Sequence, residues 1–120
     1  MGLTHVTVTI RATQKSRNKY EAIFLVDTGS SDSMAPRAEL KKIGITPIDK
    51  KIYELADGSK REYEFGIAVI EFMGEITAGR IIFGPDDVEP ILGVEALESV
   101  GIIVDPKKRT LRRLPAIPLK

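Results

Sequence analysis

The chain has 120 residues, of which 42% are hydrophobic and 29% charged, and a formal net charge of +1. These are ordinary values for one globular domain, and we expect a single domain over residues 1–120. The absence of cysteine excludes disulfide scaffolds, thiol nucleophiles and cysteine-based zinc sites. No apolar run approaches the roughly 20 residues that span a bilayer, so we expect a cytoplasmic protein with no membrane partner.

The first part of the chain predicts two strands and a helix. Alternating apolar residues predict a strand over residues 4–11, and the continuous apolar run in residues 20–26 predicts a strand buried on both faces. A short helix is predicted over residues 36–43, because Pro36 suits its first position and Gly44 suits the left-handed residue after its end.

The central part of the chain predicts two hairpins. Strands over residues 51–55 and 60–65 flank an Asp-Gly step, which favours a type I′ turn with positive φ at both central positions. Two further strands, over residues 67–73 and 76–83, meet at Gly74-Glu75.

The last part of the chain predicts a second helix, over residues 94–100, and a final hairpin over residues 102–114. Short β-branched runs recur throughout, separated by 10 glycines and 7 prolines, which is typical of an antiparallel all-β protein. One near-repeat is visible: an apolar run, a glycine, a short helix and Gly-Ile occur over residues 24–45 and again over residues 91–102. Only the first copy carries an aspartate directly after its apolar run.

The acid is Asp27, in the segment Asp27-Thr28-Gly29-Ser30 that ends the predicted buried strand. Gly29 allows the backbone N–H to approach and hydrogen-bond the carboxylate, and the Ser30 hydroxyl can bond its outer oxygen. A plain Asx turn is the alternative, because all four residue types are common in turns. The segment on its own is a weak signal.

With its surroundings included, the chain resembles the retropepsin-like aspartic proteases, in particular their small prokaryotic members. The resemblance rests on the segment 27–30, the hairpin at residues 56–59 where that family has its flap, and the run Leu-Gly-Val-Glu-Ala-Leu over residues 92–97. It implies an all-β, retropepsin-like closed β-barrel with one or two short helices, present as a homodimer.

The resemblance also implies roles for individual residues. Asp27 would be the catalytic acid, Thr28 would lock two copies of the turn together, and Gly29 would orient the carboxylate. The residues implied to bind substrate are Ser30, Ala56, Asp57, Gly58 and Ser59. The residues implied to support the site from beneath are Ile91, Leu92 and Gly93.

An aspartic protease needs two carboxylates about 3 Å apart that share one proton. This chain supplies one, so we expect an Asp27 dyad across a homodimer, with no metal or cofactor and an extended peptide or protein as substrate. We also expect an acidic or mildly acidic optimum, because a hydrogen bond from Ser30 would favour the ionised carboxylate.

Two alternatives remain open. The tip of the proposed flap is more polar than that of viral enzymes, so the chain could be a catalytically inactive dimeric peptide-binding module of the same fold. The ends of the chain are basic, with four cations and no acid in residues 1–20, and they could form a nucleic-acid patch if the terminal strands lie together. No aromatic residue is interleaved with the C-terminal cations, which argues against that second alternative.

Overall fold

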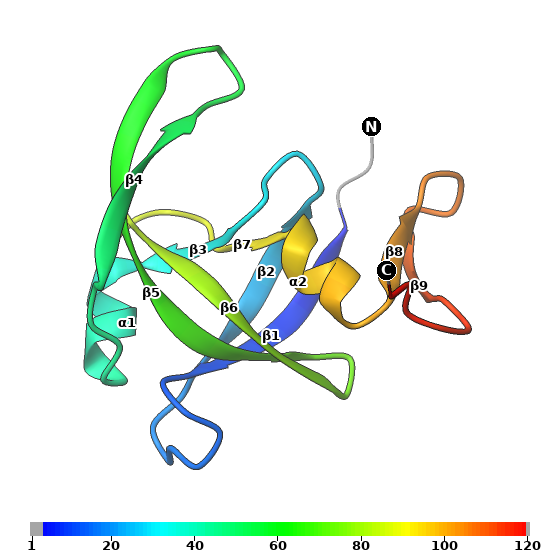
Figure 1. Cartoon of the computed structure of the whole chain (residues 1–120), viewed down its shortest axis with the longest axis horizontal. Coiled ribbons are helices and arrows are strands. Elements are labelled where there is room, and N and C mark those ends of the chain that lie inside the picture. The colour runs from blue at the N-terminus through cyan, green and yellow to red at the C-terminus, as the bar shows by residue number, and fades with distance from the viewer. Residues whose placement is uncertain (1–3, 120) are drawn as a thin grey trace.

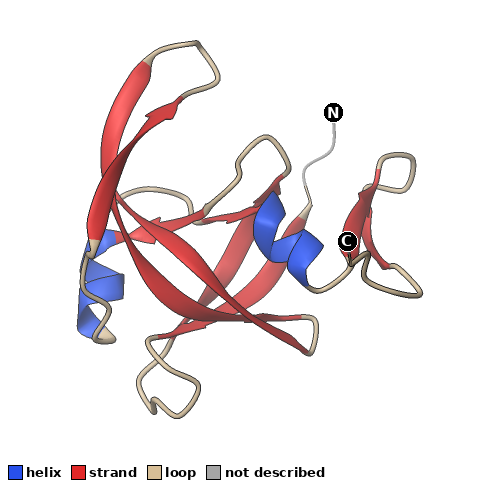
Figure 2. Cartoon of the chain, in the orientation of Figure 1, coloured by secondary structure: helices blue, strands red, loops and turns tan. Residues whose placement is uncertain are grey.

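The computed structural model describes residues 4–119, in which nine strands and two short helices are formed (Figures 1 and 2). In chain order they are β1 (His5–Arg11), β2 (Tyr20–Asp27), β3 (Ser33–Pro36), α1 (Arg37–Lys42), β4 (Asp49–Glu54), β5 (Lys60–Phe72), β6 (Glu75–Gly84), β7 (Ile91–Gly93), α2 (Val94–Ser99), β8 (Ile102–Asp105) and β9 (Thr110–Arg113). The prediction of an all-β fold with short helices is confirmed. No helix in residues 4–119 is long and apolar enough to cross a membrane.

Seven strands form one sheet that closes on itself. Their order is β1-β2-β7-β3-β6-β5-β4, and a further pairing of β1 with β5 joins the two sides into a ring. Most neighbours are antiparallel, but β7 runs parallel to β2 and β3 runs parallel to β6. Strand β4 pairs with β5 at the outer end of the sheet, so the β4–β5 hairpin projects from the ring (Figure 1).

The core fills the ring from the inner face of each strand. Strand residues alternate between the two faces, so every second apolar side chain points inward. One buried leucine from each helix, Leu40 of α1 and Leu97 of α2, packs into the same cluster. Its largest fully buried members are Phe24, Ile10, Leu40, Ile70, Ile81, Leu92, Leu97, Ile102 and Val8.

Three strand predictions need correction. Strand β2 is not buried on both faces, because the ring is filled from one side only and Ile23 is 63% exposed. The strands predicted over residues 60–65 and 67–73 are one continuous strand, β5, which passes through Gly66. Strand β3 was missed because its four residues include Ser33 and Pro36, both of which are common in turns.

The type I′ turn predicted at the Asp57-Gly58 step is wrong. At the Asp57-Gly58 step only Gly58 has positive φ, +84°, and the loop is closed by the Gly58 N–H donating to the Leu55 carbonyl. Positive φ at both central residues occurs instead at Met73 (+52°) and Gly74 (+76°), between β5 and β6. The Asp-Gly step occurs in three-residue as well as two-residue hairpin loops, because both kinds of loop need a residue with left-handed φ and glycine adopts it readily.

The near-repeat corresponds to a structural repeat. Gly44 after α1 and Gly101 after α2 both have positive φ, and each is followed by a buried isoleucine, Ile45 or Ile102. The first helix starts at Arg37, one residue later than predicted, because Pro36 is extended and still pairs with β6.

Gly66 and Gly79 provide a matched test of packing inside the sheet. A Cβ on Gly66 would lie 2.9 Å from the Thr46 carbonyl oxygen, whereas a Cβ on Gly79 of the neighbouring strand β6 would meet nothing within 4 Å. We expect Gly66→Ala to lower the free energy of unfolding by about 1–3 kcal/mol, since overpacking strains a filled core. Gly79→Ala should leave it unchanged or raise it slightly. Equal effects in urea denaturation would contradict this account.

Candidate active site

Asp27 is the last residue of β2 and is followed at once by a tight turn. It pairs with Gly93 in the parallel β2–β7 ladder, so its position is fixed by the sheet. The Gly29 N–H donates to Asp27 Oδ1 at 3.0 Å, as the sequence predicted. The carboxylate is half-buried, and Thr28 and Gly29 are exposed on the loop beyond it. A carboxylate is therefore held in a fixed direction at the surface of a single chain.

The segment Ile91-Leu92-Gly93 lies directly against this loop, as predicted. A Cβ on Gly93 would lie 2.6 Å from the carbonyl carbon and oxygen of Asp32, so only glycine allows the two backbones to approach this closely. The Gly93 N–H donates to Ser33 Oγ at 2.9 Å, and the Val94 N–H donates to the Ser30 carbonyl at 2.7 Å. Strand β7 and the start of α2 therefore support the loop after Asp27.

The prediction for the Ser30 hydroxyl is wrong. Ser30 Oγ donates to the Asp32 carbonyl at 2.7 Å and not to the Asp27 carboxylate. The Ser30 N–H already donates to the Asp27 carbonyl at 3.1 Å, and the turn that this bond closes directs the side chain along the loop. Ser30 therefore gives no reason to expect an acidic optimum.

The β4–β5 hairpin rises beside the loop that carries Asp27 (Figure 1). We call residues 49–65 the flap. The predicted substrate-binding residues of the flap, Ala56, Asp57, Gly58 and Ser59, are all exposed at its tip. There Asp57 Oδ1 accepts from both Ser59 Oγ and the Ser59 N–H, at 2.6 and 2.9 Å, and these bonds lower the pKa of the Asp57 carboxyl. The tip is thus ordered by its own hydrogen bonds.

A polar cluster between the flap and the loop was missed in the sequence. Asp32 is 7% exposed, and its Oδ2 accepts a hydrogen bond from the Tyr53 hydroxyl of β4 at 2.8 Å. Arg80 Nη1 of β6 lies 3.9 Å from the same oxygen. Burial, followed by the bond to Asp32, raises the pKa of Tyr53 to about 12. The three residues come from segments far apart in the sequence, so no local sequence pattern predicts that they form a cluster.

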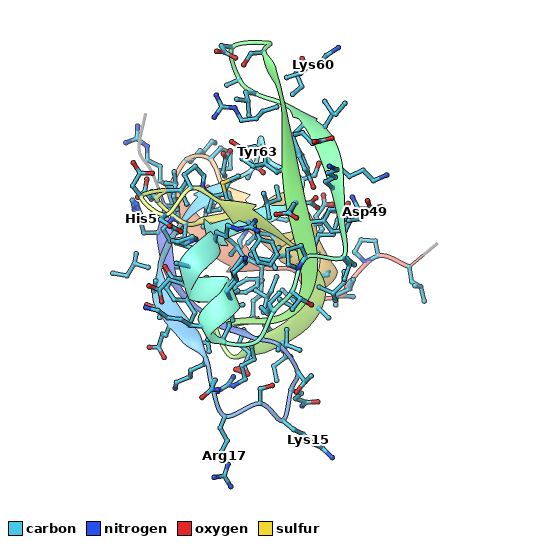
Figure 3. All side chains as sticks on the ribbon, turned by 90° about the vertical axis from the view of Figure 1, so that its left-hand side faces the viewer. His5, Lys15, Arg17, Asp49, Lys60 and Tyr63 are labelled. Carbon is cyan, nitrogen blue, oxygen red and sulfur yellow. The ribbon has the colours of Figure 1, made fainter. Side chains whose placement is uncertain are left out.

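The two ends of the chain touch where Thr4 Oγ1 donates to the Arg109 carbonyl, but in residues 4–119 most of their cations lie on separate loops. Lys15 and Arg17 lie at the end of the β1–β2 loop (Figure 3), whereas Lys107 and Lys108 lie in the turn of the β8–β9 hairpin. At the end of β9, the Arg113 guanidinium donates to the Glu75 carboxylate and to the Met73 carbonyl. Lys120 lies outside the described residues. Within the described part of the chain, the cations of the two loops therefore do not join into one continuous patch (Figure 1).

The raised pKa of Tyr53 predicts a stability change at high pH. The unfolded chain releases the Tyr53 proton near pH 10 and the folded chain only near pH 12, so unfolding becomes easier as pH rises through that range. We expect wild type to lose more stability between pH 10 and 12 than Tyr53→Phe in denaturant titrations. The same pH dependence in both proteins would show that the phenol of Tyr53 is not perturbed.

Comparison with known proteins places this geometry in a family. The model of the aspartyl protease family matches residues 6–96, and no relative was found among curated proteins. Among solved structures, EIAV protease in complex with the inhibitor HBY-793 is similar at a TM-score of 0.60 and 20% identity, covering 83% of this chain and 89% of that chain.

Two cellular structures are also similar. The retroviral protease-like domain of Ddi1 from Leishmania major has a TM-score of 0.55 and 18% identity, covering 96% of this chain and 92% of that chain. A retropepsin-like aspartic protease from Rickettsia conorii has a TM-score of 0.54 and 17% identity, covering 87% of this chain and 85% of that chain. With the retropepsin-like fold and a family match over most of its length, the chain belongs to the aspartyl protease family.

Proposed function

We propose that this protein is an aspartic endopeptidase whose catalytic dyad consists of Asp27 from each of two copies of the chain. The observation that carries the proposal is the Asp27 carboxylate at the end of β2, oriented by the Gly29 N–H and placed beside the flap. The family match over residues 6–96 includes this loop and the flap.

The second acid has to come from a second copy. Two carboxylates about 3 Å apart cannot both ionise, and the shared proton makes one a base and the other an acid. Within one chain, the structural repeat places Gly93 directly opposite Asp27 in the parallel ladder, so the repeat offers no second acid. Thr28 and Gly29 are exposed next to Asp27, which leaves this part of the loop free to meet its equivalent in a partner.

The reaction then follows from the dyad. The ionised Asp27 takes a proton from a bound water, which attacks the carbonyl carbon of the peptide, while the protonated Asp27 donates to the carbonyl oxygen. The tetrahedral intermediate collapses when the leaving nitrogen receives a proton from the dyad, and the carbon–nitrogen bond breaks. The substrate lies extended between the flap and the loop, where its backbone can pair as an added strand.

Replacing Asp27 with asparagine tests the mechanism. We expect Asp27→Asn to lower kcat/KM for a denatured protein substrate by on the order of 10³ or more, because the general acid and base are both lost. Asp87→Asn, which changes an exposed acid in the loop before β7, should retain activity. Cleavage by Asp27→Asn at the wild-type rate would refute the assignment.

The dimer is tested by mass and by dilution. Light scattering of wild type and Asp27→Asn should give twice the 13.2 kDa chain mass. Asparagine keeps an Oδ1 that can accept from the Gly29 N–H, and the bond from the Ser30 N–H to the carbonyl of residue 27 does not involve the side chain. Activity per chain should fall when the protein is diluted below its dimer dissociation constant. A monomer that cleaves at full rate under all conditions would contradict a shared dyad.

A peptide-binding module without catalysis is the second candidate, favoured by the exposed polar tip of the flap at Asp57 and Ser59. The two functions separate in one experiment with pepstatin, an inhibitor that mimics the tetrahedral intermediate. An endopeptidase cleaves denatured protein and is inhibited by pepstatin. A peptide-binding module without catalysis binds peptides and later releases them uncleaved.

A further inference from the structure

Asp32 is unusual because it is the one buried charged side chain in residues 4–119. A carboxylate removed from water is strongly destabilising unless hydrogen bonds or cations compensate it. Its position is also fixed at the backbone, where its carbonyl accepts from Ser30 Oγ and its peptide group packs on Gly93. The carboxylate is therefore a rigid part of the loop that carries Asp27.

The flap supplies the shortest contact to this carboxylate. The Tyr53 hydroxyl donates to Asp32 Oδ2 at 2.8 Å, and Tyr53 lies in β4, two residues before the flap turn begins at Leu55. Strand β4 is the outer strand of the sheet and pairs with β5, so its other edge has no strand beside it in the described residues. The Tyr53–Asp32 bond therefore links the free strand of the flap to the active-site loop.

Arg80 completes the cluster from the ring. Its guanidinium lies 3.9 Å from Asp32 Oδ2 and 4.5 Å from the centroid of the Phe65 ring, at the base of the flap. Cation–π contact with Phe65 holds the guanidinium beside the carboxylate. Arg80 therefore places a positive charge beside the carboxylate that accepts the hydrogen bond from Tyr53.

We propose that Tyr53, Asp32 and Arg80 form a tether that sets the position of the flap relative to the loop carrying Asp27, and that Tyr53 is the positioning residue of this tether. The proposal rests on the proposed function for its effect on peptide cleavage, but the tether itself is a property of the chain. In the proposed dimer each flap would be held by its own active-site loop, so that a substrate meets a flap already positioned for closure.

The raised pKa of Tyr53 is consistent with this arrangement. A phenol with a pKa of about 12 keeps the proton that it donates to Asp32 at alkaline pH, where a free phenol would lose it. Loss of the donor would leave Asp32 buried with Arg80 as its remaining partner, at a distance longer than a hydrogen bond. The flap would then open more often, while the loop carrying Asp27 would keep its backbone bonds to α2.

The test compares Tyr53→Phe with Tyr63→Phe. Tyr63 lies on the flap strand β5 (Figure 3), with its ring centroid 6.1 Å from that of Tyr53, so its substitution removes a hydroxyl from the same part of the flap without removing the donor to Asp32. Amide hydrogen exchange in the full-length protein is measured for peptides covering residues 49–65. Tyr53→Phe should speed exchange there about tenfold, and Tyr63→Phe should change it less than twofold.

A double-mutant cycle assigns the effect to the bond. Tyr53→Phe in an Asp32→Asn background should speed flap exchange less than it does in wild type, because the charged acceptor is already gone. Equal effects in the two backgrounds, or an unchanged flap in Tyr53→Phe, would overturn the tether. Faster exchange across the whole ring as well as the flap would also overturn it, since the bond would then serve global stability.

Cleavage kinetics provide the functional readout. For a peptide substrate, Tyr53→Phe should raise KM about tenfold with kcat within twofold, because a loosened flap weakens the binding of substrate and transition state alike. A fall in kcat with KM unchanged would overturn the positioning role. If wild type cleaves no peptide, the proposed function fails while hydrogen exchange still decides whether the tether exists.

Discussion

The close approach of Gly93 to the backbone of the loop after Asp27 is the contact on which the rest of the site depends. A side chain at position 93 would meet the carbonyl group of Asp32 at 2.6 Å, so the parallel pairing of β2 with β7 requires glycine there. That pairing holds the end of β2 in register, and α2 then begins with its first N–H groups donating to the carbonyls of Ser30 and Ser31. One small residue thus couples the direction of the Asp27 carboxylate to the core beneath it.

The flap is built by a different balance of forces. The base of the flap is held by packing, since Phe65 is buried and the Arg80 guanidinium lies over the Phe65 ring. Next to Phe65, Glu64 forms an ion pair with Arg37. Beyond the base, the flap is a two-stranded hairpin with an exposed tip, and such hairpins are marginal alone in water. The bond from Tyr53 to Asp32 therefore acts where the hairpin has little other support.

Sequence patterns predicted the elements well where local chemistry decides them. The glycines after both helices have the expected positive φ, and the last hairpin forms over β8 and β9. The patterns failed where one residue type serves two geometries. The Asp57-Gly58 step closed a three-residue loop in place of a type I′ turn, and the apolar run of β2 belongs to a strand with one solvent-facing side, at Ile23.

The sequence by itself determined the tight turn at residues 27–30, because the bond from the Gly29 N–H to the Asp27 carboxylate is local to that turn. The packing of residues 91–93 against this turn followed from the resemblance to the retropepsin-like proteases and not from a local pattern. Gly29 approaches Asp27 within the same turn, so this contact could be predicted without the fold. The tertiary structure alone decided that Ser30 turns to the Asp32 carbonyl and that Asp32 meets Tyr53 and Arg80. Those contacts join β4, β6 and the loop after β2, and only the closing of the sheet into a ring brings such distant segments within hydrogen-bonding distance.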